Sequence, residues 1–171
     1  MADRPLHRLA TLEDFQAVHA LYMHDAVVPY LGLDPMPAAD FRPHYVDLLA
    51  TRRFQVVEQA GRIRGFYRTA RHGGRAAHVG FLATLAVDPA MHGTGFAREM
   101  VETAIERLRA EGVLRIELMV EADNGRAQAF YRKLGFEHEG TLRAAYKRAG
   151  EQGYVDELYF ARLLPGLGVA G

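Results

Sequence analysis

The chain has 171 residues and 49% hydrophobic content, which suits one globular domain with a substantial core. Its 21 Lys and Arg residues balance 21 Asp and Glu residues, so the basic excess typical of nucleic-acid binders is missing. The absence of cysteine excludes disulfides, thiolate metal sites and a cysteine nucleophile. No stretch approaches the roughly 20 apolar residues of a membrane helix, and the first ten residues hold no apolar run of signal-peptide length. We therefore expect a cytoplasmic protein without nucleic-acid, membrane or metal partners.

The first half of the chain predicts two helices and three strands. Thr11 has the character of a helix N-cap, and Glu13 and Asp14 follow in a first turn where the helix dipole favours negative charge. Gly61 marks a tight hairpin turn. The expected elements are a strand at Leu6–Leu9, helices over 11–23 and 39–51 separated by a proline-rich loop or lid over 27–39, and strands over 53–59 and 62–70.

The second half predicts a buried strand over 77–87, which is apolar on both faces and therefore central. An amphipathic helix begins near Phe96 and ends at Gly112. A strand over 114–120, a helix opening at Asn124 and two closing strands over 136–147 and 154–163 complete the chain. The order is β-α-α-β-β-β-α-β-α-β-β, which predicts a mixed α/β fold.

A glycine-rich loop between strand and helix is the most informative stretch. It reads His92-Gly93-Thr94-Gly95-Phe96-Ala97 and directly precedes a helix. Helix N-termini expose unpaired backbone N–H groups, and glycines let the backbone approach a ligand closely. The loop therefore predicts an anion site, most naturally for a diphosphate. The Gly-Lys-Ser/Thr ending of a P-loop is missing, and Arg98 stands where a dinucleotide fingerprint needs Gly or Ala. A tight turn without a ligand stays open as the alternative.

Two motifs in order resemble the GNAT acetyltransferase superfamily. The first is Leu85-Ala86-Val87-Asp88-Pro89 with the loop that follows. The second runs from Asn124 through Tyr131 to Gly135-Phe136. The closing segment, from Phe136 through Glu157, resembles that of bacterial L-amino-acid and phosphinothricin-type N-acetyltransferases. This resemblance implies a single GNAT domain over 5–165, with a central, mostly antiparallel sheet of about seven strands flanked by helices.

The resemblance also implies acetyl-CoA as cosubstrate and a set of site residues. The backbone of the preceding strand would align the pantetheine arm, the loop amides would hold the diphosphate, and Asn124 would hydrogen-bond the pantetheine. Tyr131 matches the general acid that protonates the departing thiolate, and the phenol and thiol pKa values are close enough for that transfer. The implied cofactor-binding residues are Leu85, Ala86, Val87, His92, Gly93, Thr94, Gly95, Phe96, Ala97, Arg98, Asn124 and Tyr131.

Two points depart from the family pattern or stay open. His92 stands where the family has Gln or Arg, which predicts weaker attraction for the diphosphate. The group that deprotonates the amine is not marked by a motif. The candidates are Glu117, Glu121 and His78, each with a solvated or structural role as the alternative.

Three functions fit these features. The first is acetyl transfer to a small primary amine such as an amino acid, by direct attack on the thioester. The second is acetylation of a protein N-terminus or lysine. The third, from another class, is a non-catalytic acyl-CoA sensor, against which the intact Tyr131 argues. Family analogy leaves a homodimer open.

Overall fold

The computed structural model describes residues 4–166 and 168, and the predicted element order is confirmed. Within these residues, seven strands form one sheet in the order β1-β2-β3-β4-β5-β7-β6. The β4–β5 pair is parallel, whereas β1–β2, β2–β3, β5–β7 and β6–β7 are antiparallel. The elements are β1 (Leu6–Leu9), α1 (Phe15–Tyr22), α2 (Ala38–Ala50), β2 (Phe54–Gln59), β3 (Arg62–Arg71), β4 (Val79–Val87), α3 (Phe96–Ala110), β5 (Arg115–Glu121), α4 (Gly125–Lys133), β6 (Glu137–Tyr146) and β7 (Val155–Leu163).

The chain divides into two compact units. The first unit contains the residues up to Thr69 together with Thr84–Thr103, and the second contains Ala70–Ala83 with the residues from Ala104 onward. The first therefore holds the glycine-rich loop, and the second holds β5, α4 and the β6–β7 hairpin. No helix in the described part of the chain is long and apolar enough to cross a membrane.

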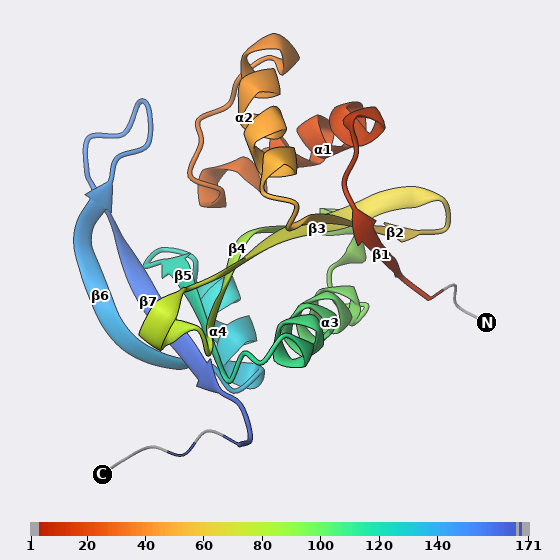
Figure 1. The fold of residues 1–171 in the computed structure, drawn as a ribbon. Helices are drawn as coiled ribbons and strands as arrows, with labels where there is room; N and C mark the ends of the chain where they lie inside the picture. The colour runs from red at the N-terminus through yellow and green to blue at the C-terminus, as the bar shows by residue number, and fades with distance from the viewer. Residues whose placement is uncertain (1–3, 167, 169–171) are drawn as a thin grey trace. The chain divides into compact units, whose positions relative to one another are not determined.

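The first unit is built around an aromatic core. In Figure 1, α1 and α2 lie on one side of β1–β3 and the start of α3 lies on the other. The Tyr22 ring packs against Phe41 and Phe66 at centroid distances of 4.9 and 5.5 Å. On the α3 side, a Cβ at Gly65 would lie 2.9 Å from the Met100 sulfur and 3.1 Å from Phe96, so only glycine allows the helix to pack so closely.

The proline-rich loop over 27–39 is packed against this core. It contains a 3-10 turn at Val28–Tyr30, and both Val27 and Val28 are buried. The Tyr22 hydroxyl donates a 3.0 Å hydrogen bond to the carbonyl of Leu31. These contacts anchor the loop, which the sequence left open as a lid.

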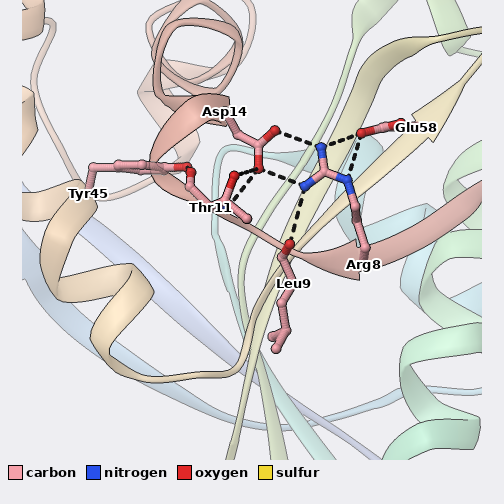
Figure 2. Close-up of polar contacts among 6 residues, drawn as sticks. All are labelled: Arg8, Leu9, Thr11, Asp14, Tyr45 and Glu58. Carbon is pink, nitrogen blue, oxygen red and sulfur yellow. Dashed lines mark hydrogen bonds and ion pairs between the residues drawn. The ribbon is translucent and has the colours of Figure 1, made fainter.

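The first helix begins differently from the expectation. A 3-10 turn at Leu12–Asp14 precedes α1. The Asp14 carboxylate accepts the backbone N–H of Thr11 at 2.8 Å, and Arg8 donates two hydrogen bonds of 2.7 Å to it (Figure 2). Arg8 also donates to Glu58 on β2. Asp14 is thus a buried anchor between β1 and the helix, in addition to lying near the helix dipole.

In the second unit, β5 is apolar on one face and polar on the other. Ile116, Leu118 and Val120 are buried in the core, while Glu117 and Glu121 point to the opposite face because strand side chains alternate. The neighbouring β7 pairs along the whole of β5, with Glu121 opposite Glu157 and Met119 opposite Tyr159. Strands β6 and β7 form the long curved hairpin seen in Figure 1.

Candidate active site

The glycine-rich loop of the first unit has a defined shape set by local hydrogen bonds. Strand β4 ends at Val87, and Asp88 accepts the Ala90 N–H at 2.9 Å and Arg64 at 2.7 Å. Partial burial opposes ionisation of Asp88, but these two bonds lower its pKa below the ordinary value. The turn at Pro89–Met91 follows, and α3 then begins at Phe96.

Four backbone amides of this loop have no protein acceptor in the described residues: Gly93, Gly95, Ala97 and Arg98. Gly93 and Gly95 have φ of 78° and 88°, and a Cβ at either would meet nothing within 4 Å. The Thr94 amide donates to the Met91 carbonyl at 3.4 Å, and the Phe96 amide donates to the Thr94 hydroxyl at 3.3 Å. The free amides lie at the positive end of α3, which fits a diphosphate group.

The end of β4 differs from the expected fully buried strand. Leu82 and Ala86 are buried, but Leu85 and Val87 are only half-buried. Thr84 has a φ of 47°, in the left-handed region that β-branched residues rarely adopt. Strain of this kind concentrates at functional sites. Nothing in the sequence marks Thr84, because the conformation of a strand residue is imposed by its neighbours in the fold.

Helix α4 of the second unit carries two predicted site residues. The Asn124 side-chain oxygen accepts the Ala127 N–H at 3.1 Å and caps the helix, so only its amide NH₂ group stays available as a donor. Tyr131 is buried, with Phe130 and Phe136 rings at 5.2 and 5.6 Å. No residue in the described ranges hydrogen-bonds its hydroxyl. Burial, followed by the charge of Glu121, raises the pKa of Tyr131 above its ordinary value.

The candidate base Glu117 is tied into an ion-pair network. It accepts the Arg115 Nε at 2.7 Å and the Tyr159 hydroxyl, and His72 lies at 3.7 Å. Arg115 also pairs with Glu139 at 2.5 Å. Burial and the bond to Glu117 raise the pKa of Tyr159 to about 12. The Glu117 carboxylate therefore has an arginine and a phenol as hydrogen-bond donors within the protein.

Glu121 lies in a different environment at the end of the same strand. It is buried, and no Lys or Arg in the described chain forms an ion pair with it. Burial raises the pKa of Glu121 to about 7, and Glu157, directly opposite on β7, adds to the rise. Tyr146 lies within hydrogen-bonding reach and Arg148 is near enough to oppose the shift. A carboxyl group with this pKa can exchange a proton near neutral pH.

The third candidate base, His78, contributes to the sheet through its backbone carbonyl. Its carbonyl accepts the N–H groups of Leu114 and Arg115 at 2.8 and 3.1 Å, which sets the start of the β4–β5 pair. No group of three or more metal-ligating side chains occurs in the residues that the structure describes.

Sequence reasoning missed three residues around Glu121, namely Tyr146, Arg148 and Glu157. The alternation of the last strand contained the signal for Glu157, because it places that side chain on one face with Tyr159. Tyr146 and Arg148 follow a break in β6 that no pattern in the chain marks.

Comparison with known proteins identifies the family. Residues 7–136 match the family described as Acetyltransferase (GNAT) family. The chain belongs to the GNAT family. The resemblance stated from the two motifs is thereby confirmed.

Two curated relatives illustrate the family's range. N-alpha-acetyltransferase RimI of Mycobacterium tuberculosis is 30% identical over 127 residues, which are 74% of this chain and 77% of the relative. A mycothiol acetyltransferase of Beutenbergia cavernae is 45% identical over 60 residues, or 35% of this chain. That match spans only 20% of the relative, about a fifth of its length.

A solved structure supports the GNAT fold. The ribosomal-protein-alanine N-acetyltransferase from Brucella melitensis has a TM-score of 0.74 at 24% identity. The likeness covers 93% of this chain and 99% of that one. Together with the seven-stranded, mostly antiparallel sheet and its four flanking helices, this confirms the predicted fold class.

Proposed function

We propose that the chain transfers the acetyl group of acetyl-CoA to a primary amine. One observation carries the proposal: a buried phenol without a protein partner, Tyr131, lies beside a buried carboxyl group with a pKa of about 7, Glu121. Family membership agrees with this reaction. In the first unit, the free amides of Gly93, Gly95, Ala97 and Arg98 would bind the diphosphate.

The two side chains account for the protons of the reaction. The acceptor arrives as an ammonium ion and gives one proton to the Glu121 carboxylate, which passes it to water. The amine nitrogen then attacks the thioester carbonyl, the C–N bond forms and the C–S bond breaks. Tyr131 gives its proton to the departing thiolate, and the second surplus proton on nitrogen restores Tyr131. Burial keeps the Tyr131 phenol protonated until the thiolate forms, but the raised pKa makes it a weaker acid than the ordinary phenol value implied.

The other predicted residues would place the cosubstrate. Backbone groups of Leu85, Ala86 and Val87 would align the pantetheine arm as an added strand, with the unusual turn at Thr84 directing them. The Leu85 amide would bind the thioester oxygen as negative charge develops on it. The Asn124 side chain would donate its amide group to the pantetheine, because its oxygen is occupied.

Glu121 is the better base of the two glutamates. Glu117 is held by Arg115, and removing a proton from an amine would require breaking that pair. Glu121 forms no ion pair with an arginine in the described residues, and burial raises its pKa to about 7, so it can take up a proton near neutral pH. The preferred acceptor is a small primary amine such as an amino acid. The M. tuberculosis relative, named for N-alpha-acetylation, keeps a peptide α-amine as the second candidate.

Thiol release from acetyl-CoA tests the proposal. The purified chain would be assayed with amino acids, polyamines and short peptides, comparing wild type with Tyr131→Phe. We expect turnover on at least one amine and a fall in kcat of at least tenfold in the variant. Tyr154→Phe is the matched control, because it removes a phenol hydroxyl from a side chain that is 68% exposed. Binding of acetyl-CoA without turnover on any amine would contradict the proposal and favour a sensor.

Three broader features belong to the same proposal. The chain acts as one GNAT domain over 5–165, works in the cytoplasm, and forms a homodimer. A balanced charge and the absence of cysteine support the location, and family analogy supports the dimer. Light scattering at several protein concentrations would test the dimer.

A further inference from the structure

The end of β5 is surrounded by side chains from three other elements of the second unit. Glu121 is the last residue of β5, Glu157 lies opposite it on β7, and Tyr131 lies on α4. Tyr146 is the last residue of β6, and Arg148 follows it. The proposed reaction assigns a role to Glu121 and Tyr131 but none to Tyr146 and Arg148.

Strand register places Tyr146 on the same face as Glu121. Tyr146 pairs with Val155 on β7. Val155 and Glu157 are two residues apart, so their side chains lie on the same face of β7. Glu157 pairs with Glu121 across the next strand boundary. Tyr146 and Glu121 therefore project from the same side of the sheet, with a hydrogen bond between them in reach.

A break in β6 directs Tyr146 toward this position. The β6–β7 register shifts between Leu142 and Tyr146. Within the break, Ala144 has a φ of 51°, and its N–H donates to the Asp156 side chain at 2.7 Å. A bulge of this kind changes the direction of the side chains that follow it. An alanine held in the left-handed region by a specific bond shows that the fold enforces this path.

Arg148 fixes the other end of the segment. Its guanidinium pairs with both carboxylate oxygens of Asp123 at 2.6 and 3.1 Å, and it lies 3.4 Å from the Tyr146 hydroxyl as a hydrogen-bond donor. Asp123 lies two residues after the end of β5 and directly precedes the Asn124 cap of α4. A bidentate pair of this geometry restricts both side chains more than a single contact would. The arginine thus connects the hairpin to the turn between Glu121 and the helix of Tyr131.

We propose that Tyr146 and Arg148 are positioning residues for the base: Arg148, held by Asp123, orients the Tyr146 hydroxyl toward the Glu121 carboxylate and so controls when and in which direction it accepts a proton. This inference rests on the proposed acetyl transfer. An oriented O–H donor stabilises the ionised carboxylate, as does the arginine charge. Without them, burial and Glu157 would leave Glu121 protonated over more of the neutral range.

Other charged groups face the same carboxylate. Glu157 on β7 disfavours its ionisation, the charge of Glu121 in turn raises the pKa of Tyr131 on α4, and Asp123 in the turn is paired with Arg148. Glu117, four residues back along the same face of β5, is neutralised by Arg115. The cation and the hydroxyl that favour the ionised form are therefore Arg148 and Tyr146.

A carboxyl titration tests the inference without relying on turnover. Protein labelled with ¹³C at the glutamate side-chain carboxyl would be titrated by NMR, with Glu121→Gln identifying the Glu121 signal. In Tyr146→Phe we expect the pKa of Glu121 to rise by about one unit. Arg148→Gln should move it in the same direction, and the double variant should move it by less than the sum if the arginine acts through the tyrosine. Tyr154→Phe and Arg143→Gln are the matched controls and should change nothing.

The rate profile separates this inference from the function on which it rests. The acidic limb of kcat/KM against pH should move upward with the titration in Tyr146→Phe, whereas a purely structural role would lower the rate without moving the limb. An unchanged Glu121 pKa in both variants would overturn the inference. A titration that moves without the rate limb would keep the positioning and remove Glu121 from the role of base.

Discussion

Strand β5 has two buried glutamates on one face, and their surroundings differ sharply. Around Glu117, an arginine at 2.7 Å, a tyrosine hydroxyl and a second pair from Arg115 to Glu139 satisfy the charge. Around Glu121, burial and the Glu157 carboxylate outweigh Arg148 and the Tyr146 hydroxyl, and the pKa of Glu121 is raised to about 7. The two side chains are equally buried, but an arginine is hydrogen-bonded to Glu117 whereas a second carboxylate lies opposite Glu121. We therefore propose a structural role for Glu117 and proton exchange for Glu121.

Replacing the two glutamates in turn is the strongest way to break this comparison. Glu121→Gln keeps the shape but cannot accept a proton, so kcat/KM should fall by about 100-fold or more. Thiol release from acetyl-CoA measures the loss, and Glu106→Gln, an exposed position on α3, serves as the control. Retention of most of the activity would mean that water or another group takes the proton.

The reverse behaviour is expected at Glu117. Glu117→Gln removes the charge that pairs with the half-buried Arg115, which should lower the free energy of unfolding by about 2 kcal/mol. Urea denaturation measures this change. The kcat of the folded fraction should stay close to that of wild type. A large loss of kcat with unchanged stability would exchange the roles assigned to the two residues.

The glycine-rich loop of the first unit sharpens the comparison, because the proposed binding groups there are backbone amides rather than side chains. Gly95→Ala introduces a Cβ at a φ of 88°, where an L side chain strains the turn that presents the free amides. We expect the KM for acetyl-CoA to rise by roughly tenfold with a smaller change in kcat. Gly73→Ala, at an exposed position with no positive φ, is the control.

The smallest effect is expected at His92. His92→Arg restores a permanent positive charge at an exposed position of the loop. The KM for acetyl-CoA should fall by about two- to fourfold at low salt, and the gain should shrink at high salt because the charge is screened. An unchanged KM at low ionic strength would show that the backbone amides alone set the affinity.

The sequence predicted the element order, the family and the loop, because each depends on local pattern. The alternation of apolar residues over 114–120 and the glycines at 93 and 95 determine the structure of their own segment. The sequence could not distinguish the surroundings of Glu117 from those of Glu121. The difference comes from Arg115, Tyr159 and Glu157, which the sheet register brings together. The positive φ angles of Thr84 and Ala144 could not be predicted from the sequence either, because neighbouring strands impose both conformations.

The pH dependence of kcat/KM for acetyl transfer, measured in wild type, Glu117→Gln and Glu121→Gln, tests the central claim most directly. A carboxyl group whose folded pKa is about 7 accepts protons only above that pH, so the wild-type rate should rise with pH through about 7. The limb should persist in Glu117→Gln and vanish in Glu121→Gln. An identical limb in Glu121→Gln, at a comparable rate, would contradict the account.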